Sequence, residues 1–228
     1  MTDSLLKRVR IWDLPTRTFH WALVLGVAGA IVSAKIGGNA MVWHLRLGYA
    51  VLTLVGFRLL WGMVGGHWSR FSSFFYGPAA LWRYLRKAPL ASDHFDAGHN
   101  PLGALSVLAM LAWLLAQVVS GLIADDEIDT TGPLVRFVSS DISLSLTAYH
   151  TSYGQWGIFT LIGLHIVSIA YYRLGKSHDL IAPMFSGYKT LSSHVPVTRD
   201  TLSTRLFALT LLGACAAAVY LLVDLGTS

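Results

Sequence analysis

The chain has 228 residues, of which 54% are hydrophobic and 13% are charged, and its mean hydropathy is +0.55. Soluble domains carry about a quarter charged residues, so this composition excludes a soluble globular protein and indicates an integral membrane protein. The single cysteine, Cys215, excludes an intramolecular disulfide, a cysteine-ligated iron–sulfur cluster and the attachment motif of a c-type haem. The net charge of +5 bears on membrane topology, and we expect no nucleic-acid partner.

Five apolar segments are long enough to cross a bilayer, which takes about 20 residues. In chain order they cover about residues 16–36, 41–64, 101–123, 144–172 and 205–224. No small-residue cleavage site follows the first segment, so we expect a membrane anchor and not a cleaved signal peptide. The sequence thus predicts an all-α membrane protein, with one main domain at 1–190 and a linker plus an extra C-terminal transmembrane helix at 191–228.

The connections between the spans carry two further features. The stretch GPAALWRYLRK places Trp82 and Leu85 among basic residues, which fits either a helix lying in the membrane interface or an ordinary basic loop. Asn100 and Pro101 are typical of the first residues of a helix. The loop after the third span is acidic, which fits either a docking surface for a basic partner or a solvated loop.

Basic residues divide unequally between the two sides of the predicted membrane domain. The side with the N-terminus holds Lys7, Arg8, Arg10, Arg17, Arg70, Arg83, Arg86, Lys87, Arg173, Lys176, Lys189, Arg199 and Arg205. The other side holds only Lys35, Arg46 and Arg136, together with Asp125, Asp126, Glu127, Asp129 and Asp141. Because positive residues concentrate on the cytoplasmic side, we expect a cytoplasmic N-terminus and a C-terminus on the outer side.

Four of the nine histidines lie inside the predicted spans, where ionisable groups are rare and usually functional. His44 and His150 lie near the outer ends of their spans, and His20 and His165 lie near the inner ends. The histidines of the connections are expected to be solvated loop residues: His67, His94, His99, His178 and His194.

The spacing of His150 and His165 argues for two separate sites. In a regular α-helix, fifteen residues return to within about 60° of the starting face and rise by roughly 22 Å. The two side chains therefore share a face at opposite depths, and one metal ion cannot bind both. A zinc site usually needs three or four protein ligands, which the spans do not offer at matching depths. A haem iron needs only two axial ligands, so two bis-histidine b-type haems fit, with four separately satisfied polar residues as the alternative.

Three further residues are candidates for contacts with the haems. Gly48 lies one turn after His44 on the same face, where a missing side chain would let a porphyrin approach. Arg58 lies about 40° from the face of His44, so its guanidinium could bind a haem propionate or reach toward the cytoplasmic interface. Arg46 has the same two interpretations on the outer side.

Several stretches of the chain together resemble the bacterial di-haem cytochrome b561 family, which includes the cytochrome b subunits of nickel–iron hydrogenases. They are VRIWDLPTRTFHW, HLRLGYAVLTLVGFRLLWGMVG, SRFSSF, GHNPLGAL, GPL, HTSYGQWGIFTLIGLHI and LIAPMFSGYK, which span nearly the whole chain to about residue 189. The resemblance implies a four-helix transmembrane bundle that holds two b haems, with a fifth helix outside it. It also implies that His20, His44, His150 and His165 are the axial ligands, in a multi-pass protein of the bacterial inner membrane.

Three functions fit this resemblance. The first is a transmembrane electron carrier that connects the membrane quinone pool with a periplasmic c-type cytochrome or other redox subunit. The second is an enzyme, a superoxide:quinone oxidoreductase, although an acidic outer loop does not attract an anion. The third is the membrane anchor of a hydrogenase, in which the catalysis belongs to the partner subunit.

Overall fold

The computed structural model describes residues 6–90, 92–128, 130–191 and 195–227. Two residues of the sequence analysis, Asp129 and His194, lie outside this part of the chain. The elements, in chain order, are β1 (Lys7–Arg10), α1 (Leu14–Ile36), the 3₁₀ turn Gly38–Ala40, α2 (Met41–Val64), the 3₁₀ turns His67–Ser69 and Phe71–Ser73, α3 (Pro78–Leu85), α4 (Pro101–Ile123), the 3₁₀ turn Val135–Phe137, α5 (Ser140–Tyr149), the π-turn His150–Gly154, α6 (Gln155–Gly175), α7 (Ala182–Ser186), β2 (Tyr188–Leu191) and α8 (Leu202–Thr227).

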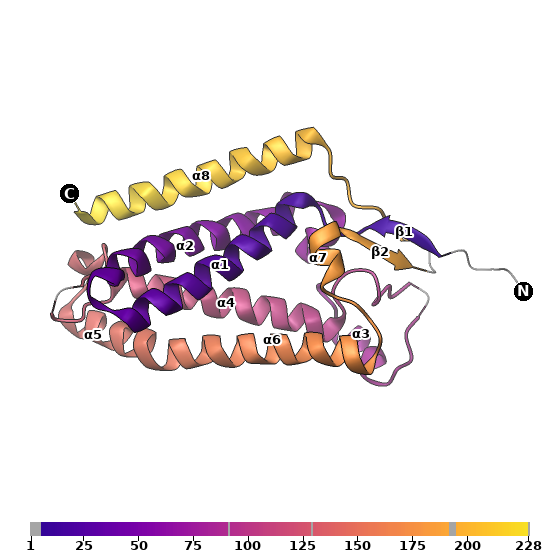
Figure 1. Cartoon of the computed structure of the whole chain (residues 1–228), viewed down its shortest axis with the longest axis horizontal. Helices are drawn as coiled ribbons and strands as arrows, with labels where there is room; N and C mark the ends of the chain where they lie inside the picture. Colours follow the sequence, from indigo (N-terminus) through magenta and orange to yellow (C-terminus); the bar gives the residue numbers. More distant parts are fainter. Residues whose placement is uncertain (1–5, 91, 129, 192–194, 228) are drawn as a thin grey trace, which may run out of the picture. The chain divides into compact units, whose positions relative to one another are not determined.

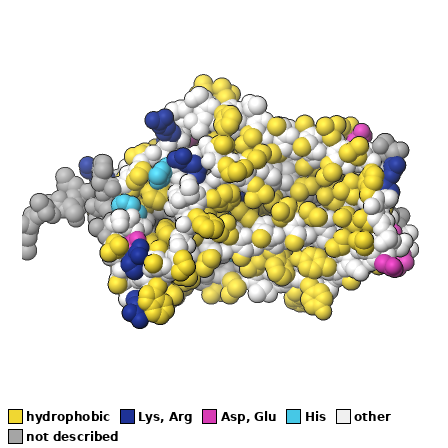
Figure 2. All heavy atoms as spheres, turned by 180° about the vertical axis from the view of Figure 1, so that it is seen from behind, with side chains coloured by type: hydrophobic (Ala, Val, Ile, Leu, Met, Phe, Trp, Pro, Cys, Tyr) yellow, Lys and Arg dark blue, Asp and Glu magenta, His cyan; other side chains and the backbone are white. Residues whose placement is uncertain are grey.

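Five helical segments are long and apolar enough to cross a membrane: Leu14–Ile36, Gly38–Val64, Pro101–Ile123, Ser140–Gly175 and Leu202–Gly226. They confirm the predicted helical membrane fold and its five spans. Hydrophobic side chains cover much of the face shown in Figure 2. Such exposure is expected where lipid, and not water, is the solvent.

The sequence predicts one regular helix for the fourth span, but the structure shows an irregular one. Residues His150–Gly154 form a π-turn between α5 and α6. Because a π-turn holds more residues than an α-helical turn, the offset calculated above for His150 and His165 does not apply through this segment. The hydropathy of the span could not show this, because hydropathy reports how apolar a segment is and not which backbone groups hydrogen-bond to each other.

Side chains close the N-terminal ends of two spans. The backbone N–H of Gly103 donates to Asn100 Oδ1 at 2.8 Å, directly before α4, which confirms the predicted cap. The backbone N–H of Thr16 donates to Asp13 Oδ1 at 2.8 Å at the start of α1. Both caps satisfy amide groups that have no partner within the helix.

The GPAALWRYLRK stretch does form a helix, α3. Trp82 and Leu85 are exposed on it, and the Arg86 guanidinium lies 4.4 Å from the centre of the Trp82 ring. Exposed apolar groups beside a cation are typical of a helix in the membrane interface. Its contact with a membrane stays a prediction.

A small sheet joins two segments that lie far apart in the sequence. Strands β1 and β2 pair antiparallel, with Lys7 opposite Leu191 and Arg10 opposite Tyr188 (Figure 1). The guanidinium groups of Arg8 and Arg10 lie 4.3 and 4.9 Å from the centre of the Tyr188 ring. The sequence analysis did not predict this sheet, because four-residue strands with charged side chains carry no clear alternating pattern.

The contacts divide the chain into two compact units. The first unit comprises Met1–Thr18, Leu59–Ala109 and Leu164–Ala208, and the second comprises Phe19–Arg58, Met110–Gly163 and Leu209–Ser228. Each of the five long helices contributes residues to both units. The first unit has a hydrophobic core under the sheet, made of Val9, Ile11, Trp12, Trp68, Ala97, Leu191 and Val195.

A buried carboxylate holds the first unit together beside this core. Asp13 is 0% exposed. Its Oδ2 accepts hydrogen bonds from the Gly66 N–H at 3.1 Å and from Ser69 Oγ at 3.0 Å, and Trp61 Nε1 donates to the same atom at 3.3 Å. One side chain thus connects the start of α1 with the end of α2 and the turn that follows it.

Replacing Asp13 by alanine should strongly destabilise the protein. The Gly66, Ser69 and Trp61 donors would lose their acceptor, and each buried group left unsatisfied costs about 1–3 kcal/mol. The measurement is the thermal unfolding temperature of the detergent-solubilised protein. Asp141→Ala, which removes an exposed carboxylate, is the matched control, and equal unfolding temperatures for the two variants would contradict the role of Asp13.

Lys189 on β2 is a half-buried charged group of the first unit. Its Nζ donates to the backbone oxygens of Asp96 and Ala97 at 3.1 and 2.9 Å. Burial lowers the pKa of Lys189 to about 8. The native protein therefore releases this proton at a lower pH than the unfolded chain does, so the free energy of unfolding rises with pH above about 8.

The Lys189→Met variant should lack this increase in stability. Between about pH 8 and the ordinary lysine pKa of about 10.4, the unfolding temperature of the wild type should rise relative to that of the variant. Lys176→Met, which removes an exposed lysine, should follow the wild-type profile. The same pH dependence for wild type and Lys189→Met would show that Lys189 does not titrate in this range.

Candidate functional site

Two of the four span histidines meet within the second unit. His44 lies on α2, and His150 is the first residue of the π-turn. Their ring centres are 5.9 Å apart and their planes are at 84°. Both side chains are half-buried.

Each of these imidazoles is held through its Nδ1 atom by a backbone carbonyl of another helix. His44 Nδ1 lies 2.9 Å from the Ala30 oxygen of α1, and His150 Nδ1 lies 2.9 Å from the Gln117 oxygen of α4. A carbonyl oxygen can only accept, so Nδ1 carries the proton in both rings. Each Nε2 therefore keeps its lone pair, which is the state in which histidine binds a metal.

A glycine of α4 makes room for the His150 ring. A Cβ atom on Gly121 would lie 2.8 Å from His150 Cε1, which is too close for any side chain. Ser120, the neighbouring residue, places its Oγ 3.1 Å from His150 Nδ1. The position of the ring thus depends on α4, a helix without a histidine.

The arrangement fits a haem iron better than a bare metal ion. In the described part of the chain, no three His, Cys, Asp or Glu side chains come close enough to hold a metal ion together. His44 and His150 would each supply one nitrogen to such an iron, and their ring centres lie 5.9 Å apart. A porphyrin would supply the four other nitrogens. A Cβ on Gly48 would meet no atom within 4 Å, so there is open space one turn from His44.

The two arginines of the sequence analysis have different surroundings. Arg58 is 3% exposed, although it lies on a membrane span. Arg46 is exposed, and its guanidinium lies 5.3 Å from the centre of the Trp43 ring. The structure therefore buries one predicted haem contact and places the other at the surface of its helix.

The two remaining span histidines belong to different units. His20 lies on α1 in the second unit, and its ring makes an edge contact with Trp21 at 5.0 Å. His165 lies on α6 in the first unit. Both are half-buried, and their pairing stays a prediction.

The sequence predicts that the histidines of the connections are solvated, and this is wrong for one of them. His178 is exposed. His99, however, packs in the first unit with its ring centre 4.8 Å from that of Trp12 and 4.7 Å from that of Phe74. The loop sequence could not show this, because the two aromatic partners come from other segments of the chain.

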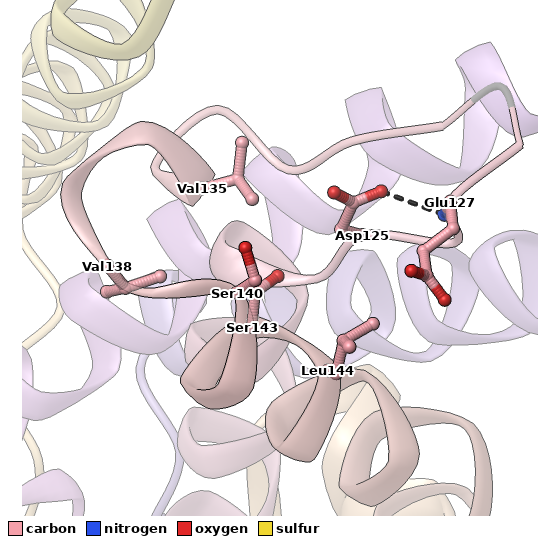
Figure 3. Close-up of a pocket in the computed structure, with 7 residues that line it drawn as sticks. All are labelled: Asp125, Glu127, Val135, Val138, Ser140, Ser143 and Leu144. Carbon is pink, nitrogen blue, oxygen red and sulfur yellow. Dashed lines mark hydrogen bonds between the residues drawn. The ribbon is translucent and has the colours of Figure 1, made fainter.

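The acidic loop uses some of its carboxylates to shape its own backbone. Asp125 Oδ1 accepts from the Glu127 N–H at 2.8 Å (Figure 3). Asp126 Oδ1 accepts from the N–H groups of Ile128 and Thr130 at 3.0 and 2.8 Å. Asp125 and Glu127 also line a pocket, together with residues of the 3₁₀ turn Val135–Phe137 and of α5 (Figure 3). The loop is thus ordered locally while it keeps its negative charge.

Three residues of α4 that contact His150 were not predicted from the sequence: Gln117, Ser120 and Gly121. Gln117 and Ser120 are polar residues inside the most apolar part of the chain before α8. Polar residues in a span are often functional, and this signal could have identified them. The sequence could not show which histidine they serve.

Several transmembrane helices with two histidine side chains close together are typical of membrane cytochromes. Residues 11–187 match the family described as prokaryotic cytochrome b561, and the chain belongs to this family. Membership implies b-type haem and electron transfer within a membrane. Neither a curated protein nor a solved structure matches the chain.

Filling the space beside Gly48 tests whether the porphyrin lies there. Gly48→Leu should lower the haem content per chain, because the new side chain would occupy the space next to the His44 ring. Gly213→Leu on α8 is a matched control, since a Cβ there also meets no atom within 4 Å. Haem is measured per chain by the pyridine haemochrome spectrum, and equal haem contents in the two variants would contradict this position.

Proposed function

We propose that the protein is a transmembrane electron carrier with two b-type haems. In this proposal His44 and His150 ligate the outer haem, and His20 and His165 ligate the inner haem. Electrons pass between the membrane quinone pool and a periplasmic redox partner, such as a c-type cytochrome. The observation that carries the proposal is the facing pair His44–His150, with both Nδ1 atoms bound to carbonyl oxygens.

The bound haem supplies the redox change of its iron. The protein's residues hold and orient it: the carbonyls of Ala30 and Gln117 fix the tautomer of each imidazole and raise its basicity. A more basic ligand favours the ferric state. Two histidine ligands would leave no open position on the iron, so such a site would carry electrons without binding a substrate there.

Two further residues support a haem in this bundle. Gly48 leaves space at the face of His44. The buried guanidinium of Arg58 suits a haem propionate, because its planar donors match the geometry of a carboxylate. Arg46, which is exposed, suits the headgroup region or the edge of the outer haem.

The charge distribution supports the orientation and the kind of partner. Basic residues on the side of the sheet favour a cytoplasmic N-terminus in the bacterial inner membrane, with the C-terminus in the periplasm. The opposite loop carries Asp125, Asp126 and Glu127, so it attracts a basic redox protein.

The same charges do not favour superoxide as a substrate. The acidic loop would repel an anion. Lys35 and Arg46 are the basic residues that could attract one, and Lys35 donates a hydrogen bond to Gln155 Oε1 at 2.9 Å. A role as a hydrogenase anchor uses the same haem pathway with a different periplasmic partner, and copurification with a hydrogenase small subunit would identify it.

Reconstituted vesicles test the proposal. The wild type should contain two b haems per chain and transfer electrons from a quinol to a haem protein outside the vesicles. His150→Ala should lose one haem and lower the rate to that of vesicles without protein, because the electron path is broken. His178→Ala, which alters an exposed histidine, should behave as the wild type. Two haems per chain in His150→Ala would refute the ligand assignment.

A further inference from the structure

Helix α4 carries no histidine, yet it contacts the π-turn of the outer ligand at three successive turns. Trp113, Gln117 and Gly121 are spaced by four residues, so they lie along one face of α4. All three, together with His150, Gly154 and Gly157, belong to the second unit.

The first of these contacts is made by an indole. Trp113 Nε1 donates to the Gly154 oxygen at 3.0 Å. A Cβ on Gly157 would lie 2.1 Å from the nearest Trp113 ring atom, so the ring rests directly on glycine backbone. Trp113 thereby fixes the end of the π-turn against α4.

Gln117 makes the second contact and binds His150 twice. Its backbone oxygen accepts the Nδ1–H of the imidazole at 2.9 Å, and its side-chain Nε2 donates to the His150 backbone oxygen at 3.0 Å. A Cβ on Gly154 would lie 1.9 Å from Gln117 Oε1, so the amide fits only against a glycine. One residue therefore holds both the ring and the backbone of the ligand.

The π-turn makes this double contact necessary. Single π-turns inside α-helices are rare and often occur at functional sites, and they change the direction of the side chains that they contain. Without a fixed partner, the first residue of the turn could present its ring at several angles. The observed ring plane lies at 84° to that of His44.

We propose that Gln117 is a positioning residue that sets the angle and the basicity of His150, and thereby the redox potential of the outer haem. This inference rests on the proposed ligation of the outer haem by His44 and His150. Gln117 acts through His150 and does not touch the iron.

Ser120 adjusts the same hydrogen bond. Its Oγ donates to the Gln117 oxygen at 2.8 Å, so the hydroxyl and the His150 imidazole share one acceptor. The same Oγ lies 3.1 Å from His150 Nδ1, so removing the hydroxyl changes both hydrogen-bond contacts of the Nδ1–H group. The basicity of the imidazole changes with these contacts, and the outer potential shifts.

The test compares Gln117→Met, Ser120→Ala and the matched control Gln155→Met in the haem-loaded protein. Gln155→Met makes the same change five residues after His150 and breaks only the hydrogen bond with Lys35. The two readouts are a redox titration that resolves both haems and the low-spin EPR g-values, which report the angle between the axial imidazole planes. Neither readout requires quinone or partner.

Gln117→Met should change the ratio of ferric to ferrous outer haem about tenfold at a fixed ambient potential, which is about 59 mV for one electron, and should shift the outer g-values. Ser120→Ala should shift the outer potential with two haems retained. The inner haem and the control should not change. Unchanged outer potential and g-values in both variants would overturn the proposal, and Ser120→Ala decides the matter if Gln117→Met loses the haem. Failure of the proposed function is distinguishable, because His150→Ala would then keep both haems.

Discussion

Inside an apolar span there is no water to bind a polar side chain, so each such group must find its partner within the protein. The structure follows this constraint at two of the span histidines and at the start of the first span. His44 and His150 donate to carbonyl oxygens of neighbouring helices. Asp13, at the start of the first span, accepts from three segments of the chain. The polar groups that a cofactor site requires are therefore also the groups that connect the helices.

This constraint explains why the outer site needs more than the two helices that carry its ligands. Helix α2 supplies His44, but α1 supplies the carbonyl that fixes it. The π-turn supplies His150, but α4 supplies the carbonyl, the amide and the glycine that fix that ring. Two elements bear the proposed ligands and two bear their supports, which gives a physical reason for four helical elements around the proposed outer site.

The first unit shows how the connections take part in the fold. The sheet of β1 and β2 joins the region before α1 to the region after α6, and its core contains aromatic residues of the connections. Gly187 has a φ of 86°, and its carbonyl accepts the N–H groups of Ile11 and Trp12 at 2.9 and 3.1 Å. The described segments next to β1 and β2 are thus structured parts of the protein, with His99 packed among them.

The sequence alone determined the five spans, the unequal charge of the two sides and the four span histidines, because hydropathy, charge and residue type are local properties of the chain. It also determined the family, through motifs spread over most of its length. Only the tertiary structure decided which groups fix His44 and His150, since a carbonyl oxygen exists at every residue and its use depends on which helix packs against it. The sheet and the contacts between Gln117 and His150 likewise join segments that lie far apart in the sequence. The contacts of Gln117 leave a polar residue in an apolar span as their mark in the sequence.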